Sequence, residues 1–352
     1  MTDPPTVAAA GGDVTVSVTV LDDPRLERAL ESLLVQSRPA QEILVADGGN
    51  SPVIAEICMR FAARDGRVRR IEAPGTIAES RNRTLTEVRS EFLAFLDTDE
   101  VAPSDWLERL MAPFTDARIG FVGGPTPGMP GTEHNIAARY YDAYLHRFYD
   151  QEARNRPYAL PMGNSAWRTR IFRDLGLLDL SLSGYGNEDL EIALRAMRAG
   201  WLGLYVPAAP VLHDFSDLGW WSLFRKQQRY ARGGYAIWRR IGSTYEASVD
   251  RVLPYLALPL VGVIGLILLP FAGLRLLGAV LGVIGFGGLA LLAAILTVQG
   301  RRDDAKYPGY RFRIVEIWRR WATLLGALQG AASRADGSAP SGGDSRAQTG
   351  KL

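Results

Sequence analysis

Two acidic residues follow a short apolar run in the first third of the chain. The run, Phe92–Leu96, holds five apolar residues bounded by polar ones and predicts a short buried strand. Asp97 and Asp99 come directly after it. Carboxylates at this spacing can hold Mg²⁺ or Mn²⁺, which take oxygen ligands and are often shared with substrate phosphates. An Asp-x-Asp pair also occurs in solvated turns, so its position in the fold must distinguish a metal site from a turn.

A second acidic pair, Glu188 and Asp189, precedes the helical pattern Leu190–Met197. Asn187 is placed to cap that helix, and acids in a first turn are favoured by the helix dipole, so the pair has a structural explanation. A carboxylate here could instead act as a general base. His213 is one of three histidines. It is either a surface residue or a neutral imidazole that completes a metal site.

Strands and helices alternate along the N-terminal part of the chain, which predicts an α/β fold with a mostly parallel sheet. In such sheets ligands bind at the carboxyl ends of the strands. Asp47, Asp97 and Asp99 all fall at such ends, which favours a binding site over a turn. The predicted strands are Val14–Val20, Ile43–Val45, Val68–Ile71, Phe92–Leu96, Ile119–Val122 and Leu204–Val206; the predicted helices cover residues 26–34, 52–64, a segment through Arg81 and Asn82, 103–114 and 190–200.

Two further segments carry local signals. Asp105 and Glu108 have the spacing of a capping box at a helix start. The segment Arg139–Asp150 is crowded with aromatic residues. It predicts either an amphipathic helix that packs its rings inward or a surface that faces an acceptor or a membrane.

Composition limits the class of protein. The 40 basic and 38 acidic residues nearly balance, so there is no overall charge of the kind that binds nucleic acid. Cys58 is the only cysteine, which excludes an internal disulfide and fits a reducing compartment. Residues 1–12 lack the basic and apolar pattern of a signal peptide, so we expect the N-terminal domain to stay in the cytoplasm.

The C-terminal third predicts a membrane anchor. Val252–Leu274 and Leu276–Gly300 carry no charge, and each exceeds the roughly 20 residues needed to cross a bilayer. Only Arg275 separates them, which predicts two transmembrane helices in a tight hairpin, or else two re-entrant halves. Lysines and arginines crowd the outer flanks, so both flanks are expected in the cytoplasm.

The segments around this hairpin mix aromatic residues with cations. Trp220–Arg232 and Tyr310–Trp321 have the composition of helices that lie in the headgroup layer. The predicted organisation is a flexible N-terminus (1–12), a catalytic domain (13–234), an interfacial linker (235–251), the transmembrane hairpin (252–300), a cytoplasmic amphipathic segment (301–330) and a disordered tail (331–352).

Together these features predict sugar transfer at a bilayer. A cation held by the Asp-x-Asp pair would neutralise charge on a departing diphosphate. The second acidic pair would supply a base that takes a proton from the attacking hydroxyl. This chemistry is in-line displacement of a nucleoside diphosphate from an activated sugar, with inversion at the anomeric carbon. The membrane anchor suggests an acceptor or product that is linked to lipid.

The segment from about Val14 to Gly234 resembles the family 2 inverting glycosyltransferases of the GT-A fold. The resemblance covers roughly two thirds of the chain and depends on an ordered set of motifs. These are VSVTVLDDPRLERALESLLVQS with EILVADGG, AESRNRTL, EFLAFLDTDE, LPMGNSAWRTRIFRDLG, GYGNEDLEIALRAMRAGW and VLHDF. It implies a GT-A nucleotide-diphospho-sugar transferase fold, a nucleotide-sugar donor and Mg²⁺ or Mn²⁺.

The resemblance also implies roles at the reacting centre. Asp189, of the pair with Glu188, would be the catalytic base, and Asp99 would be the direct metal ligand. Asp97 would lie beside the ribose or the metal. His213 resembles a histidine that approaches the metal in some relatives.

Other positions would bind the rest of the substrates. Asp47 resembles the acid that contacts the nucleotide base, and Arg81 the residue near the diphosphate. On the acceptor side the matching or suitably placed residues are Gly163, Asn164, Arg229 and Arg232.

The chain departs from the family pattern at two places. The first strand leads into Leu21–Pro24 instead of an Asn-Arg loop, which puts nucleotide contacts from that loop in doubt. Gln227–Tyr230 does not match the Gln-x-x-Arg-Trp motif of processive members, which favours addition of a single sugar. One alternative is transfer directly to polyprenyl phosphate, and another is a degenerate transferase that serves as a membrane scaffold.

Overall fold

The computed structural model describes residues 13–132, 134–182, 186–241, 249–303 and 313–332. These residues form two compact units, one holding residues 13–132 and 145–215, the other 134–144 and 216–332. The helix α5 (Ile136–Gln151) contributes residues to both, and it confirms the helix predicted for the aromatic segment. The flexible N-terminus predicted for residues 1–12 lies outside the described residues, as do residues 333–352 of the tail predicted for 331–352; residues 331 and 332 belong to a helix.

The first unit is built on a seven-stranded sheet with the order β3-β2-β1-β4-β7-β6-β8. The neighbours of β1 and β2 are parallel to them, as β6 is to β8, while β7 runs antiparallel to β4 and β6. The predicted α/β fold with a mostly parallel sheet is confirmed. The strands are β1 (Val14–Val20), β2 (Glu42–Asp47), β3 (Val68–Glu72), β4 (Phe92–Asp97), β6 (Ile119–Gly123), β7 (Ser165–Arg168) and β8 (Leu202–Tyr205); β5 (Glu100–Val101) and β9 (Leu212–His213) form a separate pair.

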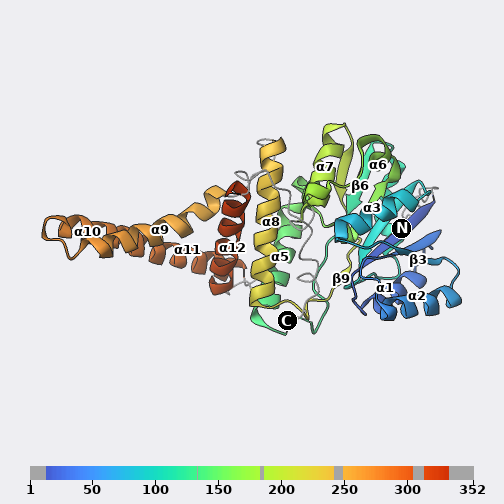
Figure 1. The fold of residues 1–352 in the computed structure, drawn as a ribbon, viewed down its shortest axis with the longest axis horizontal. Coiled ribbons are helices and arrows are strands. Elements are labelled where there is room, and N and C mark those ends of the chain that lie inside the picture. The colour runs from blue at the N-terminus through green and yellow to red at the C-terminus, as the bar shows by residue number, and fades with distance from the viewer. Residues whose placement is uncertain (1–12, 133, 183–185, 242–248, 304–312, 333–352) are drawn as a thin grey trace, which may run out of the picture. The chain divides into compact units, whose positions relative to one another are not determined.

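Helices cover both faces of this sheet (Figure 1). One layer holds α1 (Leu26–Leu34), α2 (Pro52–Arg64) and α4 (Trp106–Met111), and the other holds α3 (Ile77–Glu87), α6 (Thr169–Leu175) and α7 (Glu188–Arg198). Short 3-10 turns connect them: η1 (Ala112–Thr115), η2 (Ala153–Asn155), η3 (Pro157–Ala159), η4 (Met162–Asn164) and η5 (Leu180–Leu182). Both sheet faces are therefore buried, as a sheet built from crossover connections requires.

Both faces of β1 are buried, although its sequence alternates apolar and polar residues. Val16 and Val18 are fully buried against the α1 and α2 layer. The polar residues between them are buried too, on the opposite face, where Ser17 donates a hydrogen bond to the hydroxyl of Thr84 on α3 (3.2 Å). Buried hydroxyls need such partners, so the hydrogen bond between Ser17 and Thr84 helps to fix where α3 packs on β1.

The predicted capping box at Asp105 and Glu108 is wrong. Asp105 occupies the N-cap position of α4 but makes no side-chain cap hydrogen bond, and the Glu108 carboxylate accepts a hydrogen bond from Ser37 instead. A capping box is present at α3, where the Thr76 hydroxyl accepts from the N–H of Glu79 and the Glu79 carboxylate accepts from the N–H of Thr76. This box fixes the start of the helix that carries Arg81.

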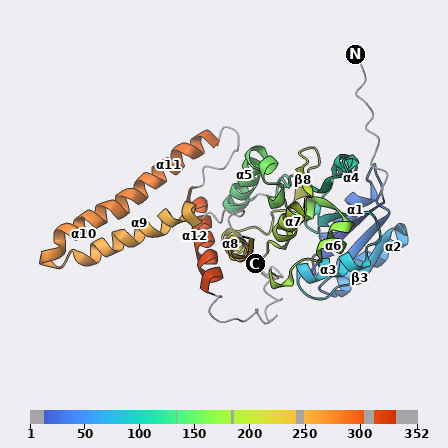
Figure 2. The same cartoon turned by 90° about the horizontal axis from the view of Figure 1, so that it is seen from above.

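The second unit is helical within its described residues. Its helices are α8 (Trp220–Ile241), α9 (Val249–Leu268), η6 (Ala272–Leu274), α10 (Arg275–Gly282), the π-helical segment η7 (Val283–Gly287), α11 (Gly288–Asp303) and α12 (Arg313–Ala332). Figure 2 shows α9 lying beside α10 and α11. The backbones approach closely there, because a Cβ added at Gly285 would lie 2.2 Å from the nitrogen of Gly262. α8 is continuous through Ile241, so no break separates the predicted catalytic domain from the predicted linker at residue 235.

The prediction of two transmembrane helices is wrong. Among the described residues one helical stretch, Ala272–Ile295, is long and apolar enough to cross a bilayer. The apolar helix before it, Ala257–Leu268, is shorter. The predicted first span fails because the chain turns around Pro270, ahead of Arg275, and Arg275 begins α10. The residue before a proline is disfavoured in the α conformation, and α9 ends at Leu268, two residues before Pro270.

Buried charges join α12 to the part of α5 that belongs to the second unit. Glu316 and Arg319 are both almost fully buried and pair at 3.1 Å, and Glu316 also accepts from Tyr140 and Arg320. Burial opposes the charge of Glu316, but the arginines outweigh it and hold the pKa of the carboxyl well below its usual range. Arg319 also lies over the ring of Tyr144, 4.6 Å from its centroid.

Candidate active site

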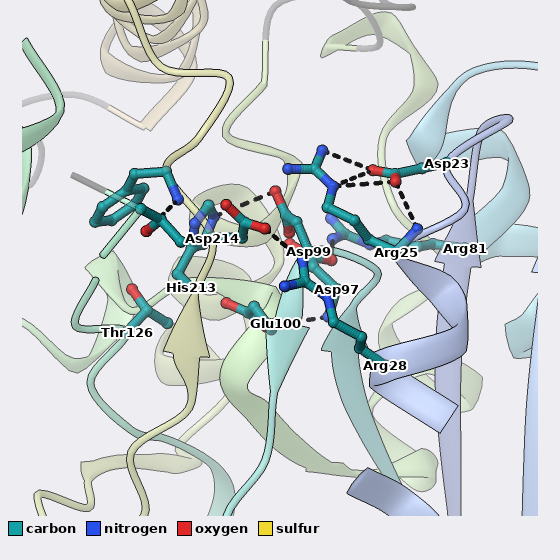
Figure 3. Close-up of polar contacts among 12 residues, drawn as sticks. Asp23, Arg25, Arg28, Arg81, Asp97, Asp99, Glu100, Thr126, His213 and Asp214 are labelled. Carbon is teal, nitrogen blue, oxygen red and sulfur yellow. Dashed lines mark hydrogen bonds and ion pairs between the residues drawn. The ribbon is translucent and has the colours of Figure 1, made fainter. Parts of the chain in front are cut away.

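The site begins where β4 ends. Asp97 is the last residue of β4, and a tight turn leads from it to β5. Antiparallel pairing of β5 with β9 sets His213 opposite Glu100, and the backbone N–H of Asp214 donates to the carbonyl of Asp99 (2.8 Å). As a result, Nε2 of His213 lies 3.5 Å from Oδ2 of Asp99 (Figure 3). Two residues that are far apart in the sequence are thus brought together as predicted from their motifs.

Arg81 links the two acidic motifs. Its Nη2 donates to Oδ1 of Asp97 (2.8 Å) and its Nη1 to Oε1 of Glu188 (3.1 Å), and its side chain is only 7% exposed. Burial opposes the charge of Arg81, but Asp97, Glu188 and Asp189 outweigh it and raise the pKa of the guanidinium. Its Nε is buried and has no hydrogen-bond partner among the described residues. Such a donor is expected to meet a ligand or water.

Asp189 lies in the first turn of α7, half-buried. Its carboxylate accepts hydrogen bonds from the N–H groups of Leu190 (2.8 Å) and Met162. Burial, followed by the neighbouring Glu188 carboxylate, raises the pKa of Asp189 to about 6. Asn187 holds the N-cap position of α7, as predicted, with a left-handed φ of 73°, but it makes no side-chain cap hydrogen bond.

Glu100 is a third acid at this edge, to which the sequence assigned no role. Its side chain is fully buried, and its Oε2 accepts a hydrogen bond from the backbone N–H of Asp97 (3.0 Å). Burial, then the charges of Asp97 and Asp99, raise the pKa of Glu100 well above its usual value. The only signal for it in the sequence is that it directly follows Asp99.

The segment predicted for the acceptor side lies against these acids. A Cβ added at Gly163 would lie 2.5 Å from Oδ2 of Asp97 and 2.9 Å from Oε2 of Glu100, so only glycine fits there. Asn164 is fully buried, and its amide bonds to Nε1 of Trp106 and to two backbone carbonyls. Its side chain is therefore committed to holding loops together, and an acceptor contact can come only from its neighbours.

An ion pair closes the site on the side of α1. Arg28, from α1, pairs with Asp214, which is almost fully buried and follows His213 (Figure 3). Beside it, Asp23 of the atypical loop after β1 pairs with Arg25 at 2.7 Å. Sequence reasoning missed both pairs, because each needs the fold to bring α1 to β9 or the loop to curl back.

The remaining predicted residues lie elsewhere. Asp47 ends β2, two strands from β4 on the same sheet edge, and pairs with Arg70. Arg229 and Arg232 lie on α8, in the second unit, and their acceptor role stays a prediction.

The groups closest to a possible metal ion are the Asp99 carboxylate and the His213 imidazole. No group of three or more His, Cys, Asp or Glu side chains among the described residues is arranged as a closed metal site. Asp99 and His213 are nevertheless in contact and partly exposed, at 27% and 17% of their side chains. Mg²⁺ typically uses one or two carboxylates and completes its shell with water and substrate phosphates. The residues present fit an ion of that kind.

Several known glycosyltransferases are similar to this chain. A family model described as "Glycosyltransferase like family 2" matches residues 11–233. The pre-mycofactocin glycosyltransferase of Mycobacterium tuberculosis (strain ATCC 25618 / H37Rv) is 28% identical over 211 residues, 57% of this chain and 43% of that protein. Glycosyltransferase AglE of Haloferax volcanii is 25% identical over 231 residues, 64% of this chain and 74% of that protein. The chain spans less than half the length of the mycobacterial relative.

A solved structure shares the architecture. The mannosyltransferase PcManGT from Pyrobaculum calidifontis, in complex with GDP-Man and Mn²⁺, aligns with a TM-score of 0.58 at 17% identity, over 94% of this chain and 90% of that chain. At this identity the likeness shows the fold alone, and it confirms the predicted GT-A fold. With a family model that spans most of the chain, the conclusion is that this protein belongs to the family 2-like glycosyltransferases.

Proposed function

We propose that this protein is a membrane-anchored, inverting glycosyltransferase that moves one sugar from a nucleotide-diphosphate sugar to a lipid-linked or membrane-associated glycan. The observation that carries the proposal is the double contact of Arg81 with Asp97 and Glu188. It supports a shared site for the base candidate Asp189, next to Glu188, and the Asp97 and Asp99 pair.

The reaction follows from the charges of these residues. Asp189, with a pKa of about 6, is mostly ionised near neutral pH and basic enough to accept a proton. It takes the proton of an acceptor hydroxyl while that oxygen forms a bond to the anomeric carbon. The bond from that carbon to the diphosphate oxygen breaks, and the nucleoside diphosphate leaves with the electron pair. One displacement inverts the configuration at carbon.

Asp99 and His213 would hold the divalent cation, with Asp97 beside them. When bound, Mg²⁺ or Mn²⁺ supplies Lewis-acid stabilisation of the departing diphosphate. The Mn²⁺ present with the archaeal mannosyltransferase supports this choice of cofactor. Arg81 adds a fixed positive charge at the same edge, and its buried Nε is a free donor among the described residues.

A membrane location is supported by composition. Ala272–Ile295 is long enough to span a bilayer, and only about a tenth of its residues are buried within the protein. α8 carries cations and exposed aromatic side chains, among them Trp221 and Trp238, as helices of the headgroup layer do. We place the catalytic unit on the cytoplasmic side, where positive flanks are retained.

Transfer to polyprenyl phosphate is the second candidate, and the cations of α8 favour it because this acceptor is an anion. Its nucleophile needs no base. In that case Asp189→Asn should cost far less activity than Asp99→Asn, whereas a hydroxyl acceptor makes both changes severe. A non-catalytic scaffold would show no metal-dependent nucleotide binding.

The test is a screen of nucleotide-sugars with Mn²⁺ or Mg²⁺ and a membrane lipid extract, following release of nucleoside diphosphate. Asp116→Asn, at an exposed ion pair with Arg118, is the matched control for Asp99→Asn. The proposal fails if no donor is turned over and Asp99→Asn behaves like the wild type in cells.

A further inference from the structure

Asn164 carries a buried amide whose oxygen and two N–H donors all have partners. It is the last residue of η4 and has no exposed surface. Its Oδ1 accepts a hydrogen bond from Nε1 of Trp106 on α4 (2.8 Å), and its Nδ2 donates to the carbonyls of Pro125 and Ala209 (2.9 Å each). Only this orientation of the amide satisfies all three partners, because a carbonyl can only accept and an indole N–H can only donate.

Two of these partners belong to loops at the candidate site. Pro125 follows β6, and Ala209 lies between β8 and β9, the strand that carries His213. The backbone of Asn164 adds another bond, because its carbonyl accepts from the N–H of Gly124 (3.0 Å). A single residue thus ties η4 to both loops.

The turn η4 is also closed from within. The hydroxyl of Ser165 donates to the carbonyl of Met162 (2.7 Å) and accepts from Nε1 of Trp167 (2.8 Å). Because the turn is fixed internally, the bonds that anchor Asn164 also set the direction of the N–H of Met162. That N–H donates to the carboxylate of Asp189.

We propose that Asn164 is a positioning residue for the base: its amide anchors η4, so that the backbone N–H of Met162 holds the Asp189 carboxylate in its reacting position. This assignment rests on the proposed function, and it differs from the acceptor contact that the family resemblance implies for Asn164. A displacement of about 1 Å in a reacting group can cost on the order of a hundredfold in rate. An anchor of this kind therefore affects turnover without touching a substrate.

The experiment compares Asn164→Ala with the wild type, each as the full-length protein in detergent with Mn²⁺. Binding of UDP and GDP is measured by calorimetry. Turnover of UDP-glucose, UDP-N-acetylglucosamine and GDP-mannose is measured with a membrane lipid extract, and the donor that the wild type uses is then followed as a function of pH. We expect turnover of Asn164→Ala to fall by about 10–100-fold, with binding of the nucleoside diphosphate changed by less than about threefold.

The acid limb of the pH profile separates positioning from a general loss of structure. Burial and the Glu188 carboxylate raise the pKa of Asp189 to about 6, while Arg81 and the N–H of Met162 limit the rise. Asn164→Ala should weaken the hydrogen bond from Met162, so the pKa rises further and the acid limb moves to higher pH. A purely structural role would lower turnover without moving this limb.

Thr169→Val is the matched control. Thr169 directly follows β7, whereas Asn164 directly precedes it, and both side chains are buried. The hydroxyl of Thr169 donates to the carbonyls of Ser90 (2.8 Å) and Glu91 (3.0 Å), away from the candidate site. Its loss should lower the melting temperature, leave the acid limb in place and change turnover by less than about twofold.

Trp106→Phe tests the same network if Asn164→Ala does not fold. It removes only the bond to Oδ1 of Asn164, so the acid limb should move in the same direction by a smaller amount. An unmoved limb in this variant would overturn the assignment.

Three further results would also overturn it. The first is an unmoved acid limb in a folded Asn164→Ala variant, and the second is an equal loss of turnover in Thr169→Val. The third is a raised KM for the acceptor at unchanged kcat, which would show that Asn164 contacts the acceptor. All three leave turnover by the wild type intact; if the wild type uses no donor, the proposed function fails and this assignment fails with it.

Discussion

Nη2 of Arg81 lies 2.8 Å from Oδ1 of Asp97, and this contact joins helix α3 to the end of strand β4. The same guanidinium reaches Glu188 on α7, so one side chain connects three elements of the catalytic unit. The position of Asp189 relative to the Asp97 and Asp99 pair therefore depends on Arg81.

Arg81→Met should destabilise the protein by roughly 3–5 kcal/mol, because it leaves the buried carboxylate of Glu188 without its counter-charge. Transfer should fall with it, since the two acidic motifs lose their common tie. The measurement is thermal unfolding in detergent together with donor turnover. Arg83→Met is the control on the same helix, at an exposed pair with Glu87. Equal melting temperatures for the two variants would contradict the role of Arg81.

Transfer to a hydroxyl acceptor should rise with pH and level off above about pH 6, because Asp189 must be ionised to accept the proton. The contribution of Asp189 to the free energy of unfolding should fall as the pH rises. A carboxyl pKa raised from 3.8 contributes stability fully below about pH 4 and loses it as pH rises through 6. Asp189→Asn should remove the acid limb and lower the rate by about 10²–10⁴. A pH profile that keeps this limb in Asp189→Asn would exclude Asp189 as its source.

Removal of the metal should mimic loss of Asp99. Chelation of divalent ions should weaken nucleoside diphosphate binding by the wild type, and should have little further effect on Asp99→Asn. His213→Ala should lower Mn²⁺ affinity by at least about tenfold, the usual effect of losing a group that supports or completes a metal site. Titration with Mn²⁺ followed by electron paramagnetic resonance measures the Mn²⁺ affinity of the wild type and of both variants. Unaltered Mn²⁺ affinity in Asp99→Asn would rule out this location of the ion.

Glu316→Gln should destabilise the second unit by roughly 3–5 kcal/mol, since it leaves the buried Arg319 without its carboxylate. The pKa of Glu316 is depressed, so its contribution is present above about pH 4.5 and is lost as pH falls toward its folded value. The wild type should therefore lose stability on acidification where the variant does not. Asp217→Asn, at an exposed residue of the same unit, should show the wild-type profile.

Two glycines of η7 should respond with opposite signs. Gly285→Ala places a methyl group against the backbone of Gly262 and should cost about 1–3 kcal/mol. Gly287→Ala meets nothing within 4 Å and should stabilise the helix by up to about 1 kcal/mol. The measurement compares the melting temperature of each variant with that of the wild type in the same detergent. A stabilising Gly285→Ala would mean that α9 and η7 are not in close contact.

Local patterns were sufficient for most of the parallel sheet. β1, β2, β3, β4, β6 and β8 were predicted because their apolar runs alternate with helices. β7 was missed because its sequence, SAWR, holds only two apolar residues, and its pairing with β4 and β6 is set by the fold. The hairpin turn was misplaced because the charge of Arg275 was given more weight than the backbone restriction at Pro270.

Part of the candidate site was predicted from the sequence, and part of it was not. Asp97, Asp99, Glu188 and Asp189 were predicted because each lies at the end of a recognisable element. Two other ion pairs of this sheet edge were not predicted. The contacts of Arg70 with Asp47 and of Asp214 with Arg28 join segments that only the folded chain brings together.

The strand order divides the sheet into two parts along the chain. The sheet half β3-β2-β1-β4 is encoded without interruption by residues 14–97, whereas β6, β7 and β8 follow later. A chimera joined just after β4 would keep this half of the sheet from one parent and take both Asp99 and His213 from the other. The proposed cation ligands would therefore be inherited together, while the strand that positions them would come from a different parent.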